Sequence, residues 1–169
     1  MKSFAWMRLF VPLALLAAGC IATLWSFLAT ANIFADDPRM RLVNWISHSL
    51  PPDARIAADF FSGLPTPERF ALDPKIQLLP QSIAIPFYHL GSAGSLAALR
   101  AQGFTYIVLS SGNFDRFFDP TAKVTGTEAI ATKRFYEEVF RQLTPMHEEP
   151  LRSDLDSQLT TRLVVYDIR

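Results

Sequence analysis

A long, uninterrupted apolar run near the N-terminus constrains this chain more than any other feature. From residue 9 to residue 28 every side chain is apolar or small, and no charged residue lies between Arg8 and Asp36. About 20 such residues in a helix span the hydrocarbon core of a bilayer. We therefore expect residues 1–35 to form a short cytoplasmic tip followed by one transmembrane helix.

Two targeting signals offer other interpretations of this run. A cleaved signal peptide has a shorter apolar core, of about 7–15 residues. A lipoprotein signal usually carries leucine three residues before its cysteine, whereas Ala17 stands three residues before Cys20 and the residues after Cys20 stay apolar. An uncleaved helix is therefore favoured. Whether Cys20 is lipidated stays open, and as the only cysteine it can form no intrachain disulfide.

The charges that flank the run predict its orientation. Lys2, Arg8 and the amino terminus make the first flank positive, whereas residues 36–41 mix acidic and basic side chains. Positive flanks stay in the cytoplasm. We expect residues 36–169 to form an extracytoplasmic domain, on the periplasmic side of a bacterial inner membrane.

Small residues recur at every fourth position of the run, which places them on one helix face. They are Ala14, Ala18, Ala22, Ser26 and Thr30. Such faces let transmembrane helices approach closely, so this strip is a candidate docking face for another helix, although alanine is also common in such helices by chance. The segment contains no His, Asp, Glu, Lys or Arg, so it offers no proton relay and no imidazole to ligate a porphyrin metal.

The charge balance gives no sign of a nucleic-acid partner. Two of the 16 basic residues, Lys2 and Arg8, precede the run, which leaves 14 against 16 acidic residues in the rest of the chain. Nucleic-acid binding usually requires a basic face.

Helix and strand patterns alternate after the run, which predicts an α/β sandwich with a mixed, partly parallel sheet. We expect helices over residues 38–50, 91–102 and 129–143. We expect strands over residues 55–59, 75–79, 82–87, 104–109, 146–151 and 162–168, with a loop over 63–74. Residues 104–109 are almost continuously apolar and β-branched or aromatic, as in a central strand that is covered on both faces.

Several segments of this domain resemble one protein family. They are Trp45-Ile46, Leu50 to Ala57, Gly103 to Ser111, Asn113 to Arg116, Phe135 to Glu137 with Phe140, and Val164 to Tyr166. Together they resemble the region after the last transmembrane helix of bacterial polyprenyl-phosphate-sugar-dependent glycosyltransferases, similar to the protein mannosyltransferase and aminoarabinose transferase families.

The resemblance implies a fold and a side of the membrane without an activity. Those enzymes carry their acidic catalytic and metal-binding residues in loops of a bundle of transmembrane helices, whereas the chain has one helix of that kind. No residue matches the family's catalytic positions, so we expect no catalytic, metal or cofactor site.

Other catalytic signatures are also missing from the sequence. It contains no glycine-rich phosphate loop, no His-Glu-x-x-His and no Cys-x-x-Cys. The histidines, His48, His89 and His147, are far apart and have no ligand-spaced partners, so we interpret them as surface or capping residues.

The segment that follows the predicted central strand is the best candidate for a ligand site. Ligands in open α/β sheets bind beyond the carboxyl ends of the strands, and the loop expected over residues 110–119 carries Ser110, Ser111, Asn113, Asp115 and Arg116. A sugar or lipid headgroup would suit these side chains. Alternatively, the phenylalanines of this loop pack on the domain or the membrane surface, and Asp115 pairs with Arg116.

These observations favour a non-catalytic accessory subunit of a larger integral-membrane complex, such as a respiratory, photosynthetic or transport assembly. Two alternatives stay open. One is the soluble-domain subunit of a split glycosyltransferase, and the other is a binder of a lipid-linked sugar that uses residues 110–119.

Overall fold

The structure is a computed structural model that describes residues 3–35, 37–67, 79–150 and 161–169. The chain divides into two compact units, residues 1–37 and residues 38–169.

The first unit is a single helix, α1 (Ser3–Ala35). It begins before the apolar run, and Pro12 lies inside the helix. The 18 residues from Pro12 to Ala29 have a mean hydropathy of 1.9, and none of them is buried. In length and composition α1 is therefore a helix that could cross a membrane.

The second unit is built on a five-stranded sheet with the order β2-β1-β3-β5-β4. The strands are β1 (Arg55–Ala58), β2 (Ser82–Ala84), β3 (Tyr106–Ser110), β4 (His147–Glu149) and β5 (Leu163–Asp167). Strands β2, β1 and β3 run parallel, whereas β5 is antiparallel to both β3 and β4. This confirms the predicted α/β fold with a mixed, partly parallel sheet.

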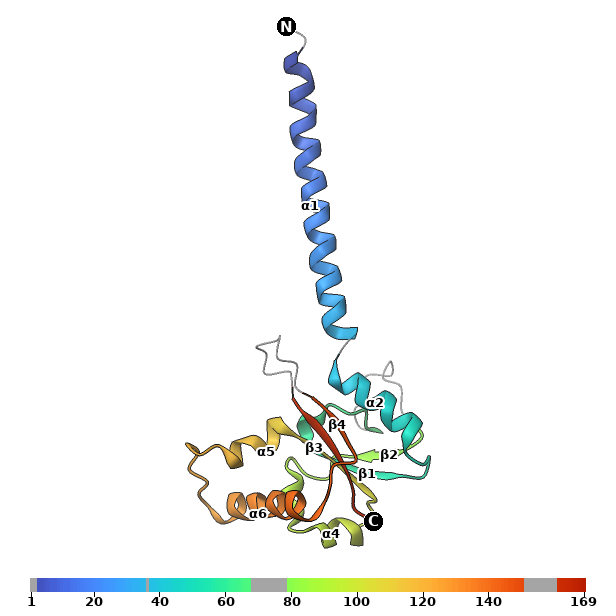
Figure 1. The fold of residues 1–169 in the computed structure, drawn as a ribbon, viewed down its shortest axis with the longest axis vertical. Helices are drawn as coiled ribbons and strands as arrows, with labels where there is room; N and C mark the ends of the chain where they lie inside the picture. Colours follow the sequence, from blue (N-terminus) through green and yellow to red (C-terminus); the bar gives the residue numbers. More distant parts are fainter. Residues whose placement is uncertain (1–2, 36, 68–78, 151–160) are drawn as a thin grey trace. The chain divides into compact units, whose positions relative to one another are not determined.

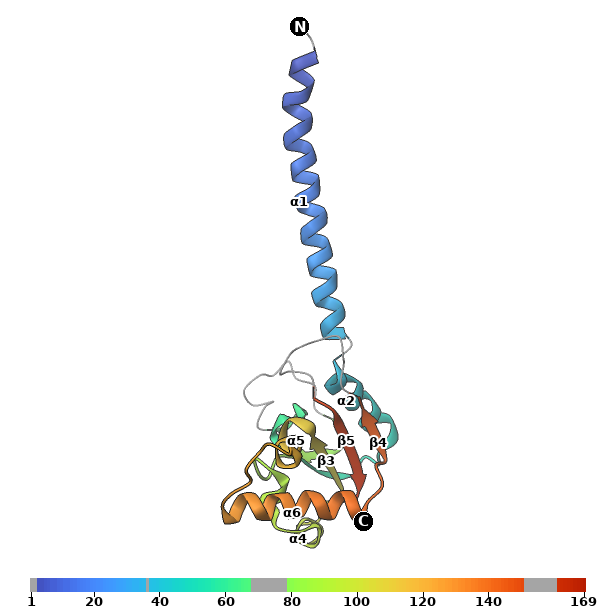
Figure 2. The same ribbon diagram turned by 60° about the vertical axis from the view of Figure 1, so that its left-hand side comes forward.

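Helices cover both faces of this sheet (Figure 1). Helix α2 (Pro38–Ser49) packs on one face, where Leu42 and Ile46 are fully buried against alternate strand residues such as Val108. Helices α4 (Leu96–Ala101), α5 (Ser111–Phe118) and α6 (Thr127–Gln142) pack on the other face. In Figure 2, α4 lies beside α6 and β4 lies beside α2, in agreement with their contacts.

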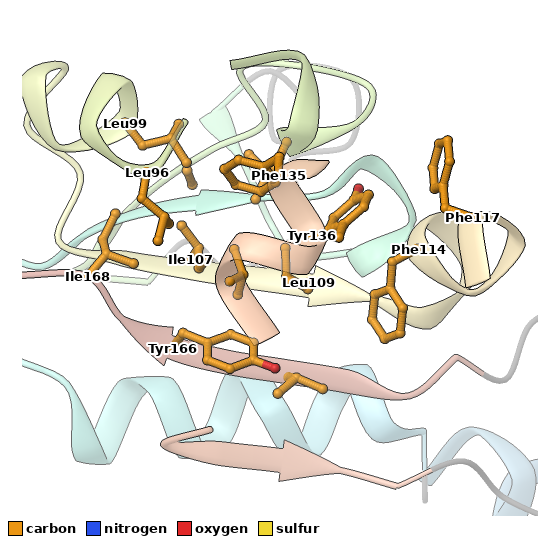
Figure 3. Close-up of a cluster of buried hydrophobic side chains, with 14 residues drawn as sticks. Leu96, Leu99, Ile107, Leu109, Phe114, Phe117, Phe135, Tyr136, Tyr166 and Ile168 are labelled. Carbon is orange, nitrogen blue, oxygen red and sulfur yellow. The ribbon is translucent and has the colours of Figure 1, made fainter. Parts of the chain in front are cut away.

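Strand β3 is the central, doubly covered strand that its sequence predicts. Every residue from Tyr106 to Ser110 is buried. Side chains of successive strand residues point to opposite faces, so Ile107 and Leu109 join the α6 side of the core, which Figure 3 shows, and Val108 joins the α2 side.

Other predicted elements differ in extent. The helix expected over residues 91–102 is a 3-10 turn, η2 (Leu90–Ala93), followed by α4. The break comes at Ser95, which has an extended backbone and is the N-cap of α4. Its hydroxyl accepts a hydrogen bond from the Ala98 N–H at 3.1 Å. The strand expected over 82–87 ends at Ala84, and the expected loop over 110–119 is mostly α5. The strand expected over 75–79 and the loop over 63–74 lie largely outside the described residues.

The spacing of apolar residues predicts that Phe135, Val139, Phe140 and Leu143 form the buried stripe of helix α6. Phe135 and Val139 are buried, whereas Phe140 keeps 37% of its surface exposed and Leu143 is half-buried. Tyr136 is fully buried as well, and its hydroxyl has a hydrogen-bond partner inside the domain.

A glycine sets the distance between η2 and α6. A Cβ atom on Gly91 would lie 2.8 Å from the backbone of Thr132 in α6. Any larger residue would push these two elements apart, because backbone atoms cannot move aside as the end of a side chain can.

Replacing Val108 tests the burial of β3. Val108→Asp places an unpaired carboxylate between the sheet and α2, and we expect it to lower the free energy of unfolding of the domain by about 4 kcal/mol. Urea unfolding of the full-length protein in detergent, followed by far-UV circular dichroism, measures the change. Ser82→Asp, at an exposed position of β2, is the control and should behave like the wild type. Equal stability of both variants would contradict the assignment of β3 to the core.

Candidate functional site at the carboxyl edge of the sheet

The carboxyl ends of β1 and β3 meet at one edge of the sheet, and Asp59 lies there. It follows β1 directly, and its side chain is completely buried. Its carboxylate accepts hydrogen bonds from the Leu90 N–H at 2.9 Å and from the Ser110 N–H at 3.2 Å. The Tyr136 hydroxyl donates a third bond at 3.2 Å.

Burial governs the protonation of this group. Loss of contact with water raises the pKa of Asp59 from 3.8 to about 6, although the hydrogen bonds from Leu90, Ser110 and Tyr136 oppose the rise. Burial and the neighbouring carboxylate also raise the pKa of the Tyr136 hydroxyl. Tyr136 therefore stays protonated and remains a donor to Asp59.

The first residues of α5 are attached to the rest of the domain. The Ser111 N–H donates to the Arg162 carbonyl at 2.9 Å, and the Ser111 hydroxyl accepts the Arg162 N–H at 2.9 Å. Asn113 is fully buried and donates from its side-chain amide to the Tyr88 carbonyl at 3.1 Å. The Ser110 Oγ and the Asn113 Oδ1 have no hydrogen-bond partner among the described residues.

The phenylalanines of α5 pack largely on the domain. Phe114 and Phe117 are buried, with ring centroids 6.0 Å and 5.7 Å from that of Tyr136. Figure 3 shows both side chains beside Tyr136 at one end of the core cluster. Phe118 keeps 39% of its surface exposed.

Asp115 and Arg116 do not face each other, because adjacent residues of a helix point in different directions. The Arg116 guanidinium contacts the His89 ring instead. Burial lowers the pKa of His89, and the positive charge of Arg116 lowers it further. Burial raises the pKa of Asp115, and the positive charge of Arg162 opposes that change.

Arg116 and His89 border a surface hollow of about 470 Å³ at the start of α6. The remaining lining residues are Phe117, Thr125, Gly126, Thr127, Glu128, Ala129 and Thr132. The hollow offers hydroxyl groups and one guanidinium, and it also contains the carboxylate of Glu128. In the described part of the chain, no group of three or more His, Cys, Asp or Glu side chains could hold a metal ion.

The five residues that the sequence predicted as one site therefore do not form a single site. Ser110, Ser111 and Asn113 are buried at the edge of the sheet, whereas Asp115 and Arg116 lie on the exposed side of α5. Asp59 is the residue that sequence reasoning missed. Its signal was an acidic residue placed directly after a short apolar strand, where ligand-binding α/β proteins often carry polar residues.

The remaining histidines also occupy defined places. His147 stacks on Trp45 with ring centroids 4.2 Å apart, and its Nε2 lies 2.9 Å from a Glu149 oxygen. Glu149 also accepts a hydrogen bond from the Arg41 side chain at 2.8 Å. The contacts of His147 and Glu149 attach α2 to β4. His48 is exposed at the end of α2.

Comparison of the chain with protein-family models, with curated proteins and with solved structures finds no match. The resemblance to membrane glycosyltransferases therefore rests on the sequence segments alone.

The raised pKa of Asp59 predicts how stability depends on pH. The folded state binds the Asp59 proton more tightly than the unfolded state, so this residue stabilises the fold most below pH 4. The contribution falls as the pH rises from about 4 to 6 and amounts to about 3 kcal/mol over this window. Asp59→Asn cannot titrate, so the free energy of unfolding of the wild type minus that of this variant should fall over the same interval. Urea titrations at several pH values measure it, and an unchanged difference would contradict burial of an ionisable Asp59.

Proposed function

We propose that the chain is a membrane-anchored accessory subunit whose domain has no catalytic role of its own. Helix α1 spans the membrane and docks against transmembrane helices of a larger complex. The α/β domain then covers part of the extracytoplasmic face of that complex, with the N-terminus in the cytoplasm.

The observation that carries this proposal is the apolar surface of α1. Every side chain from Pro12 to Ala29 is exposed. Exposed apolar surface costs about 25 cal/mol per Å² in water, so a surface of this length needs lipid or protein around it. A bilayer with neighbouring helices supplies both.

The face proposed for docking combines two rows of small residues. Ala14, Ala18, Ala22 and Ser26 are exposed along one row, and Thr30 extends it in sequence. Gly19 and Thr23 lie next to this row and line a hollow on the helix surface. The Thr23 hydroxyl donates to the Gly19 carbonyl at 2.9 Å, so its polar group is satisfied within the helix. Small, internally satisfied side chains allow close van der Waals packing in lipid.

The domain supports a non-catalytic role through the way it uses its polar residues. In ligand-binding α/β proteins the carboxyl edge of the sheet holds the substrate. Here Asp59 is enclosed by three donors, and Ser111 is bonded to the chain before β5. Catalytic groups must reach a substrate, and these two groups face the interior of the domain.

One observation favours a second candidate, a domain that binds a lipid-linked sugar, alone or as part of a split glycosyltransferase. The Arg116 guanidinium is exposed and borders the hollow beside α6. Guanidinium groups suit the phosphates of such lipids. Co-purification with one multi-helix protein that lacks this domain would favour the split enzyme.

Substitution in the small-residue face tests the docking. Ala18→Leu with Ala22→Leu keeps the helix apolar, so insertion should proceed. Two bulky side chains one turn apart would hold a partner helix away, and the variant should be present in membranes but lost from the complex recovered in mild detergent.

The control for this variant is Leu13→Ile with Leu28→Ile, at two exposed positions that belong to neither row of small residues and do not line the hollow. Equal recovery of the complex from the two variants would contradict docking through this face. Recovery of the wild type only as a lone monomer would count against the accessory role itself.

A fusion after Arg169 tests the orientation. We expect a reporter that is active only outside the cytoplasm to be active at this position, because the positive flank of α1 stays inside. Activity of a cytoplasmic reporter at the same position, with silence of the first, would show that the charge argument is wrong.

A further inference from the structure

Three aromatic side chains form an exposed cluster beside the carboxyl edge of the sheet. Phe60 and Phe61 belong to the 3-10 turn η1 (Phe60–Ser62), which follows Asp59, and Tyr88 precedes η2. Their side chains are 43%, 38% and 50% exposed, respectively. Each ring contacts the other two, with centroids 5.0 to 5.7 Å apart. We call these three residues the aromatic cluster.

The domain fixes the position of the aromatic cluster. The buried amide of Asn113 holds the Tyr88 backbone through its carbonyl, and the N–H of Ser62 bonds to the Asp59 carbonyl at 3.0 Å. Hydrogen bonds made by buried polar residues thus hold the exposed aromatic residues in place. Exposed aromatic surface that is held in place in this way is typical of an interaction site.

The aromatic cluster lies at the end of the domain where the chain enters it. Gly63 ends η1, and the Arg39 side chain lies against it, because a Cβ atom on Gly63 would come 2.5 Å from the Arg39 Cδ. Arg39 is the second residue of α2, and helix α1 ends four residues earlier, at Ala35. Four residues span at most about 14 Å.

We propose that Phe60, Phe61 and Tyr88 insert into the boundary between headgroups and acyl chains of the membrane that α1 crosses. This inference rests on the proposed membrane anchoring. Tyr and Trp are enriched at this depth, where the ring is buried and a polar group such as a phenolic hydroxyl can still bond to headgroups. Phe occurs with Trp and Leu on apolar protein faces that lie in the same boundary.

Charge near the aromatic cluster fits a lipid surface. The Tyr88 and His89 rings lie 4.6 Å apart, and the exposed Arg116 contacts His89. A guanidinium at the rim of an aromatic cluster can pair with lipid phosphates. Three half-exposed rings would bind a membrane weakly from solution. A covalent anchor removes most of that difficulty, because it keeps the domain at a high effective concentration next to the surface.

A site-specific fluorescent label tests the insertion. The full-length chain with Cys20→Ser and Phe61→Cys is labelled with an environment-sensitive fluorophore and reconstituted into vesicles of phosphatidylethanolamine and phosphatidylglycerol. Some of the lipids carry a nitroxide high on the acyl chain. We expect a blue-shifted emission and a loss of intensity through nitroxide quenching. The matched control carries the label at Ala97→Cys, an exposed position on α4, and should show neither change.

Removal of the other two rings sharpens the test. Phe60→Ser with Tyr88→Ser should return the label at position 61 toward the emission of the control, while circular dichroism stays unchanged. Emission at position 61 equal to that at position 97 would overturn the insertion. Blue-shifted emission without lipid quenching would overturn it too, because a protein would then cover the aromatic cluster.

Carbonate extraction of the same vesicles separates this inference from the proposed anchoring. Release of the chain into the supernatant would reject the anchor, and the insertion with it. A chain that stays in the membrane with a water-exposed label at position 61 would reject the insertion alone.

Discussion

The buried carboxylate of Asp59 joins several separate parts of the domain at one point. It follows β1, and its three donors come from the end of β3, from η2 and from α6. A carboxylate that lost these donors would be left in an apolar interior, at a cost of several kcal/mol. The end of β3, the η2 turn and helix α6 therefore depend on one another for their positions around Asp59.

The contact between Gly91 and Thr132 reinforces this arrangement. It allows η2 to lie against the backbone of α6, which brings the Leu90 N–H and the Tyr136 hydroxyl to the same carboxylate. The aromatic cluster depends on the same region, since η1 begins directly after Asp59 and Tyr88 lies two residues before Leu90. The hydrogen bonds of the buried Asp59 carboxylate thus help to position the exposed aromatic residues that lie near it in sequence or near its donor Leu90.

Local patterns in the sequence predicted the parts of the fold that depend on local interactions. The length of the apolar run predicted α1, the apolar run of β3 predicted a doubly covered strand, and helical spacing predicted α6. Helix α5 was missed because Ser111, Gly112 and Asn113 are typical of turns. Its helical form depends instead on the bonds between Ser111 and Arg162 and on burial of Phe114.

The candidate site was predictable in its place but not in its composition. Residues 110–116 do lie at the carboxyl edge of the sheet, as the position after the central strand suggested. The position of Asp59 directly after an apolar strand was a usable signal, but its hydrogen-bond partners could not be predicted, because they lie 31, 51 and 77 residues away along the chain. No local pattern records contacts of that range, and the same holds for the aromatic cluster of Phe60, Phe61 and Tyr88.

The two edge strands of the sheet have a consequence for a domain that is held at a membrane surface, as we propose for this one. Both edge strands that the structure describes, β2 and β4, are three residues long, and β4 carries the exposed Glu148. Anchored copies would share a plane and meet one another far more often than copies free in solution. Long, uncharged edges would then invite strand pairing between neighbours. Short edges offer few backbone groups for such pairing, and on β4 the exposed Glu148 adds a charged side chain to the edge.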